Sequence, residues 1–217
     1  MKLYRCNKTV LRFYPKATAF LNGYTTNTVD APLTAFVDIQ GRIVAAAHQF
    51  RQSDDEVWEV VEDRFVERLL KHLHTYLSLS DTRVETLVSK KVYWDLESKE
   101  LLVTDEKRAV SASEEEFTLF RVKNAFPLQG VDFDEEMVLN VGEEGLVSYS
   151  KGCYLGQEIV ARVHYRGRPP KQLVVKEQKD CAPEEFGCMT SKVFDPDSKQ
   201  MAGFILTGII AGTPPAC

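Results

Sequence analysis

The strongest constraint on the fold comes from two apolar, β-prone runs that flank the short segment Gln40-Gly41-Arg42. The runs cover residues 33–39 and 43–47, and the glycine turn between them predicts an antiparallel strand pair. A further strand-like run at 57–60 precedes the segment 63–77, where apolar residues recur at intervals of three, four and seven. This spacing predicts an amphipathic helix with Asp63 as its N-cap.

The rest of the chain shows the same mixture of elements. Strands are predicted at 1–14, 84–94, 101–104 and 146–150, and helices at 15–23 and 117–125, the second opened by the acidic run 114–116. The pair Pro169-Pro170 is a stiff break that predicts a domain boundary. It divides the chain into a region 1–168 and a short β module 169–217, with strands predicted at 173–175, 188–193 and 201–210.

Length and composition limit the class of protein. With 217 residues, 44% of them hydrophobic, the chain can bury one core, or one core and a small second module. No run of 18 apolar residues is present, so no membrane contact is expected. The first residues lack the apolar region of a secretory signal, and a cytoplasmic location is expected. A net charge of −5 argues against direct nucleic-acid binding.

The five cysteines form an odd set without a C-x-x-C pair. This pattern argues against a disulfide framework and a closed zinc site, and it favours reduced thiols. His72 and His74 lie two positions apart on the predicted helix and therefore point to different faces. No metal site is predicted.

The most informative stretch for function is Lys-Gly-Cys-Tyr-Leu-Gly-Gln-Glu at 151–158. The order strand, glycine-bearing turn and helix places Cys153 near a helix N-terminus, with Lys151 two residues away. Both influences favour thiolate over thiol, which makes Cys153 a candidate reactive or ligand-binding thiol. The alternative is a small buried apolar residue, because free cysteine is often buried.

Cations are concentrated around this stretch. Between residues 151 and 171 a single anion, Glu158, is accompanied by five cations: Lys151, Arg162, Arg166, Arg168 and Lys171. Either they form a solvated basic face, or they receive a carboxylate or phosphate. The residues alone leave both interpretations open.

The pattern K-G-C-Y-x-G-Q-E, continued by Ile159-Val160-Ala161-Arg162 and closed by Arg166-Gly167, resembles the signature of the YgfZ family of folate-binding proteins. That family is related to the aminomethyltransferase (T-protein, GcvT) of the glycine cleavage system. Thr26-Asn27, Gln40-Gly41-Arg42 and Phe120-Arg121-Val122 are similar to further landmarks of the family. Ala125, where the family commonly has glycine, and the segment 137–140 depart from its pattern.

The resemblance implies an α+β fold of GcvT/YgfZ-like folate-binding modules around a central opening, with a small C-terminal β-barrel-like module. It implies tetrahydrofolate or a derivative as cofactor, and iron–sulfur client enzymes, with their link to tRNA modification, as partners. By motif match, Cys153 is the key thiol. The positions carried over as cofactor-binding are Lys151, Tyr154, Gln157, Glu158, Arg162, Asn27 and Arg42.

Three alternatives stay open. An aminomethyltransferase is disfavoured because its pattern has Asp where Cys153 stands, and because its Gly-Tyr-Thr-Gly-Glu landmark is missing, so an accessory protein is favoured over an enzyme of this type. An RNA-associated folate module, as in the tRNA-modifying GTPase MnmE, lacks support because no phosphate-binding G-x-x-x-x-G-K is present. A folate-free interaction scaffold fits the length of the chain, which is shorter than most members of the family.

Overall fold

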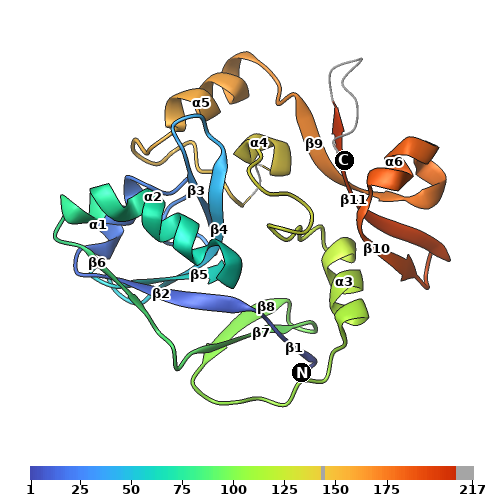
Figure 1. Cartoon of the computed structure of the whole chain (residues 1–217), viewed down its shortest axis with the longest axis horizontal. Helices are drawn as coiled ribbons and strands as arrows, with labels where there is room; N and C mark the ends of the chain where they lie inside the picture. Colours follow the sequence, from blue (N-terminus) through green and yellow to red (C-terminus); the bar gives the residue numbers. More distant parts are fainter. Residues whose placement is uncertain (143–144, 209–217) are drawn as a thin grey trace.

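The computed structural model describes residues 1–142 and 145–208. In this part of the chain, the strands form three open antiparallel sheets, and helices lie against or between them (Figure 1). The α+β class is therefore confirmed. No helix among these residues has the length and apolar character needed to cross a bilayer.

The largest sheet contains the predicted hairpin. Its strands, in spatial order, are β3 (Leu33–Val37), β4 (Ile43–Arg51), β5 (Val57–Glu62), β2 (Lys8–Tyr14) and β6 (Arg83–Thr86). Gly41 turns the chain between β3 and β4 with φ +74°, a conformation that glycine adopts without strain. One face of the sheet packs against α1 (Ala17–Asn22) and α2 (Val66–Ser78), and the contact buries a core in which Leu69 and Leu73 are fully enclosed.

The predicted helix at 63–77 is present, but its start differs. It opens with the 3-10 turn η1 (Asp63–Phe65), which leads directly into α2. The carboxylate of Asp63 accepts a hydrogen bond from the hydroxyl of Thr9 at 2.7 Å. The assignment of Asp63 as N-cap is thus wrong, because the neighbouring strand β2 supplies its partner.

The second sheet has the order β1 (Leu3–Arg5), β7 (Lys91–Asp95) and β8 (Glu100–Thr104). Together with α3 (Glu114–Lys123) it encloses an aromatic core that includes Trp94, Phe117 and Phe120. The strands predicted at 1–14 and 84–94 are each divided between the two sheets, as β1 with β2 and β6 with β7. Both segments cross from one sheet to the other, which periodicity within a segment does not reveal.

The C-terminal module is an open three-stranded sheet rather than a barrel. Its order is β10 (Thr190–Asp195), β11 (Gln200–Gly208) and β9 (Lys171–Glu177), accompanied by η2 (Gln178–Asp180) and α6 (Pro183–Cys188). The barrel-like expectation is wrong, since three strands are too few to close on themselves. Residues 209–217 of the predicted module, including the end of the strand expected at 201–210, lie outside the described residues.

The C-terminal sheet shares a continuous core with the first 168 residues. Leu173, Val193 and Phe204 belong to the same buried cluster as Ile43 and Val160. The division at residue 169 stays a prediction. Among the cysteines of the described part, Cys188 is disulfide-bonded, so the expectation of reduced thiols is wrong there.

A buried carboxylate adds a polar link between the same two parts. Asp132 accepts hydrogen bonds from Arg121 Nη1 (2.6 Å), Thr190 Oγ1 (2.8 Å) and Ser191 Oγ (2.6 Å). The side chain of Asp132 is fully buried and that of Arg121 is 6% exposed. The buried carboxylate of Asp132 therefore links Arg121 of α3 to Thr190 and Ser191 of β10.

Candidate functional site

The signature stretch forms an irregular loop that ends at α5 (Gln157–Arg166). The strand predicted at 146–150 is not formed; turns and bends occupy these residues. The backbone N–H of Ser148 donates to the carbonyl of Thr26 at 2.9 Å, and that of Leu155 donates to Gly23 at 2.9 Å. The loop is held by the irregular segment after α1, which offers no continuous strand as a partner.

Cys153 lies in this loop, four residues before α5 begins. Its side chain is exposed and its thiol is free. The alternative of a buried apolar cysteine is therefore wrong. One reason to expect a thiolate was a lysine beside Cys153, but the ammonium of Lys151 is bonded to the carbonyls of Thr25 and Asn27 instead. The thiolate character of Cys153 therefore stays a prediction.

Lys151 is turned into the protein. Its ammonium donates to the carbonyl oxygens of Thr25 (2.6 Å) and Asn27 (2.8 Å), and it lies 5.3 Å from the centre of the Tyr154 ring. Burial lowers the pKa of Lys151 to about 8, and the charge of Glu59 opposes this shift. The lysine thus anchors the loop to the segment that follows α1.

Two other predicted site residues, Asn27 and Tyr154, are buried beneath the loop. Asn27 is buried, and its amide donates to the carbonyls of Leu33 (3.1 Å) and Gly145 (2.8 Å). Tyr154 is buried in the core shared with the C-terminal sheet, and burial raises its pKa to about 12. Both residues are well placed to fix the shape of the loop.

The hairpin landmark and the signature are in direct contact. Gly156 has φ +83°, and a Cβ at this position would lie 2.3 Å from the carbonyl oxygen of Asp38. A Cβ on Gly41 would lie 3.0 Å from the side chain of Val160. Only glycine permits so close an approach at Gly156. At Gly152, by contrast, a Cβ would meet no atom within 4 Å from the described residues beyond its chain neighbours.

The remaining predicted residues face outward. Arg42 is exposed and its guanidinium donates to the carbonyl of Glu135 at 3.1 Å. Glu158 and Arg162 form an exposed ion pair of 2.7 Å, one turn apart on α5. Gln157, the first residue of α5, is half-buried. These groups are accessible to a small molecule, in contrast to Asn27.

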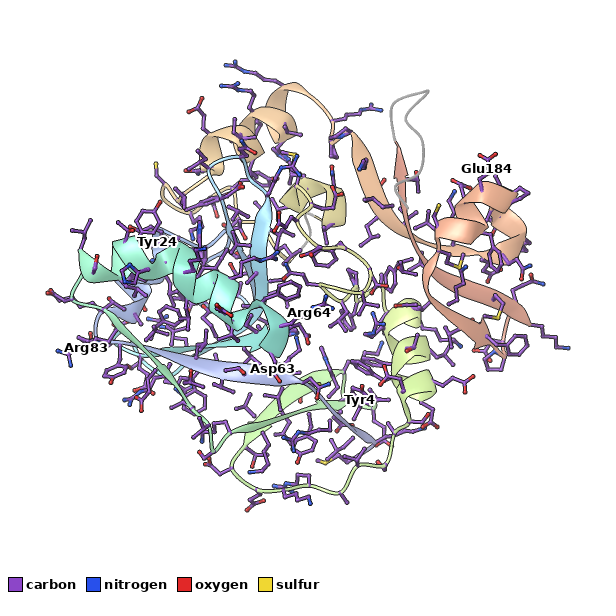
Figure 2. The ribbon with its side chains drawn as sticks, viewed as in Figure 1. Tyr4, Tyr24, Asp63, Arg64, Arg83 and Glu184 are labelled. Carbon is purple, nitrogen blue, oxygen red and sulfur yellow. The ribbon has the colours of Figure 1, made fainter. Side chains whose placement is uncertain are left out.

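The cations of this region do not form a single cluster. Lys151 points inward, Arg162 pairs with Glu158, and Lys171 lies 3.6 Å from a carboxylate oxygen of Glu136. Side chains ending in nitrogen extend away from α5 into solvent (Figure 2). The structure therefore divides the cations between an internal anchor and an exposed basic face.

Two polar residues of the large sheet were missed by the sequence analysis. Glu59 on β5 is fully buried, and Gln49 on β4 is its direct cross-strand partner. The available signal was the position of Glu59, two residues from both Val57 and Val61, which places it on the same face of the strand as these apolar residues.

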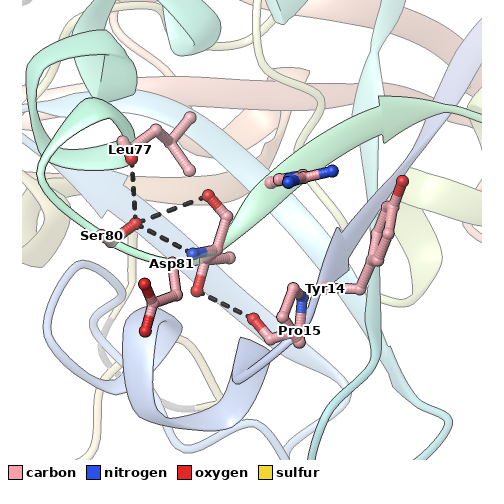
Figure 3. A pocket seen from close by; sticks show the side chains of 7 residues that line it. Tyr14, Pro15, Leu77, Ser80 and Asp81 are labelled. Atoms are coloured by element: carbon pink, nitrogen blue, oxygen red, sulfur yellow. Dashed lines mark hydrogen bonds between the residues drawn. The ribbon is translucent and has the colours of Figure 1, made fainter.

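Two hollows are present elsewhere. One, of about 370 Å³, lies between the segment 130–136 and the C-terminal sheet and is lined by Phe133, Asp134, Glu136 and Phe204 among others. The other lies beside Tyr14 and Pro15, where Ser80 and Thr82 hydrogen-bond to neighbouring backbone groups (Figure 3). None of the predicted site residues lines either hollow, but Arg42 donates to the carbonyl of Glu135, between the lining residues Asp134 and Glu136 of the first one. Within residues 1–142 and 145–208, no group of three or more His, Cys, Asp and Glu is arranged to hold a metal ion.

The fold defines the class of protein. The chain is similar to the crystal structure of glycine cleavage system aminomethyltransferase T from Bartonella henselae, with a TM-score of 0.67 over 96% of this chain and 78% of that one. Sequence identity is 10%, so this likeness establishes an aminomethyltransferase-type fold and nothing about activity.

Comparison of the sequence with curated proteins finds YgfZ proteins among its relatives. The chain is 32% identical over 83 residues to the tRNA-modifying protein YgfZ of Hamiltonella defensa, and 34% identical over 102 residues to that of Vibrio atlanticus. These matches cover 37% and 46% of this chain but only 25% and 29% of the relatives. An uncharacterized protein of Haemophilus influenzae is 24% identical over 199 residues, 79% of this chain and 71% of that protein. No family model matches. Over the matched segments the chain is thus similar to YgfZ proteins, and its fold is similar to that of an aminomethyltransferase.

Proposed function

We propose that this chain is a tetrahydrofolate-binding accessory protein of the YgfZ type, which supports assembly or repair of iron–sulfur enzymes with Cys153 as its key thiol. The observation that carries the proposal is the exposed, free thiol of Cys153 on a loop that Lys151 anchors from inside. A thiol that serves client proteins has to be accessible and held in place. Support for tRNA modification would follow indirectly, through iron–sulfur enzymes that modify tRNA.

The side chains present fit the chemistry of a folate. A pterin ring carries amino groups that need acceptors and a flat surface that packs on aromatic rings. The hollow beside segment 130–136 offers Phe133 and Phe204 together with the carboxylates of Asp134 and Glu136. The glutamate tail of a folate is anionic, and Arg162 and Lys171 are cations that can form charge-assisted hydrogen bonds with it.

Among the site residues, the roles we propose follow their burial. Lys151, Tyr154 and Asn27 hold the loop in the shape that the cofactor meets. Gln157, Glu158, Arg162 and Arg42 are the accessible groups proposed to contact the cofactor itself.

A titration with 5-formyltetrahydrofolate tests the cofactor. Wild-type protein is expected to show saturable binding, which Arg162→Ala weakens by roughly tenfold or more, since a hydrogen bond to a charged group contributes about 1.5–3 kcal/mol. Arg51→Ala is the matched control, because Arg51 is an arginine paired with Asp30 and Asp54 at a loop remote in sequence from the signature. No binding at millimolar ligand would favour the folate-free scaffold. Methylene transfer from an aminomethyl-lipoyl carrier would instead favour an aminomethyltransferase.

Alkylation kinetics test the thiol separately. The rate of reaction with iodoacetamide is measured against pH in the wild type and in Cys153→Ser, which provides the background from the other free cysteines. The wild type is expected to react faster than Cys153→Ser, because the Cys153 side chain is exposed and its thiol is free. Equal rates for the two proteins would remove the proposed reactivity.

A further inference from the structure

Glu59 is an anomaly in the core of the large sheet. It is 0% exposed, and neither of its carboxylate oxygens has a hydrogen-bond partner among the described residues. Val57 and Val61, two positions before and after it, belong to the core beneath α1 and α2, so Glu59 faces the same core. An ionised carboxylate buried without donors is strongly unfavourable, and a carboxylic acid avoids most of that cost.

Gln49 provides the acceptor that such an acid needs. It lies directly opposite Glu59 on β4, where cross-strand side chains of one face are in contact. The Gln49 amide nitrogen donates to the carbonyls of Thr28 (2.9 Å) and Ala31 (3.0 Å), which sets the orientation of the amide. Its Oε1 is buried and has no partner within the described part of the chain. If Glu59 carries a proton, its O–H can donate to Oε1 of Gln49, which gives that oxygen a donor and removes the negative charge from the buried carboxyl group.

Lys151 is the one charged group, among the described residues, whose charge acts on the pKa of Glu59. Burial raises the pKa of Glu59 well above its ordinary value, and the charge of Lys151 opposes that shift. The other titratable side chains of this core are Tyr24, Tyr76 and His72, which pack on one another at ring distances of 4.6 and 6.2 Å (Figure 2 labels Tyr24). Apolar residues make up the core cluster itself, from β2 (Leu11, Phe13), β4 (Ala45, Ala47), α1 (Phe20, Leu21) and α2 (Leu69, Leu73).

We infer that Glu59 is held as a carboxylic acid against Gln49 and is a positioning residue for the Cys153 loop, acting through Lys151. Gln49 and Lys151 meet at one backbone segment, because the Gln49 amide donates to the carbonyl of Thr28 at 2.9 Å and the Lys151 ammonium donates to those of Thr25 and Asn27 at 2.6 and 2.8 Å. While Glu59 is neutral, the Lys151 ammonium stays on the carbonyls of Thr25 and Asn27. When the O–H bond of Glu59 breaks and its proton passes to solvent, a buried anion is left. This anion attracts the ammonium away from the carbonyls, and Cys153, two residues along the chain, moves with it. The inference does not depend on folate binding.

The protonation state is tested on the wild-type protein by labelling glutamate carboxyl carbons and following their NMR signals with pH. One glutamate is expected to remain protonated at pH 7, and its signal is expected to be missing in Glu59→Gln. If every glutamate carboxyl titrates near the ordinary value, about 4.3, the inference is overturned. The wild-type titration decides this even if the variant does not fold.

Stability against pH gives an independent readout with a defined sign. Because the folded-state pKa of Glu59 is raised, the folded state keeps a proton that the unfolded state has lost, and stability falls as pH rises from the ordinary value of 4.5 towards neutral. Glu59→Gln has no such proton, so its urea midpoint is expected to lack this decline. Parallel curves for the two proteins would contradict the assignment.

The positioning role is tested by the pH profile of Cys153 alkylation. Wild-type protein is expected to show an inflection besides that of the thiol, lost in Glu59→Gln and kept in the control Glu62→Gln. Glu62 lies on the same strand but pairs with Lys8 at 2.5 Å. Profiles that superimpose in the wild type and Glu59→Gln would refute the coupling between Glu59 and the loop.

Discussion

Replacing Asp132 with alanine is expected to weaken the junction between α3 and the C-terminal sheet more than any surface change. The carboxylate is fully buried and accepts four hydrogen bonds, from Arg121, Thr190, Ser191 and the backbone N–H of Leu128, all between 2.6 and 2.8 Å. Its removal leaves the Arg121 guanidinium buried without its counter-ion. Breaking a buried ion pair in this way costs about 3–5 kcal/mol. That is a large fraction of the 5–15 kcal/mol typical of a folded domain.

The measurement is urea unfolding followed by circular dichroism. With a slope of about 2–3 kcal/mol per molar urea, the loss corresponds to a midpoint lowered by roughly 1–2.5 M. Asp197→Ala is the matched control, because Asp197 is 82% exposed and forms its ion pair with Lys123 of α3, the helix that also carries Arg121. An exposed pair contributes about 0–1 kcal/mol, so the control is expected to shift the midpoint little. Equal shifts for Asp132→Ala and Asp197→Ala would refute the reasoning that burial decides the strength of this link.

Two further predictions concern local backbone geometry. Gly156→Ala is expected to cost about 2 kcal/mol or more, because it places a Cβ 2.3 Å from the Asp38 carbonyl at a strained positive φ, whereas Gly152→Ala, with nothing within 4 Å, is expected to stay within about 0.5 kcal/mol. Urea midpoints compare the two, and equal costs would contradict the contact between loop and hairpin. Ser113→Ala is expected to cost about 1 kcal/mol, since Ser113 and Glu116 form a capping box at the start of α3 with bonds of 3.2 and 2.8 Å. A thermal midpoint unchanged from the wild type would show that tertiary packing, and not the cap, fixes that helix end.

Local patterns anticipated much of the secondary structure. The hairpin around Gly41 and the helix α2 follow from alternation, a glycine turn and helical spacing, which depend on neighbours in the sequence. The position of Cys153 shortly before α5 also follows, but the sequence left open whether its side chain is exposed or buried, and the structure shows it exposed. Membership of a sheet is different. In β1, Leu3 pairs with Asp95, 92 positions further along the chain, whereas in β2 Lys8 pairs with Glu62, 54 positions further along. No local period distinguishes these two strands.

The sequence by itself determined the signature loop leading into a helix and the family resemblance, because both depend on short-range spacing and residue type. The resemblance in turn implied the α+β class. Only the tertiary structure decided that Lys151 points inward and Arg162 outward, although both are cations of one short stretch. It also placed Glu59 opposite Gln49 on the neighbouring strand. There the charge of Glu59 acts on the pKa of Lys151, which is 92 positions further along the chain. Burial and hydrogen-bond satisfaction are properties of contacts between distant segments, and they assign opposite roles to residues of the same chemical type.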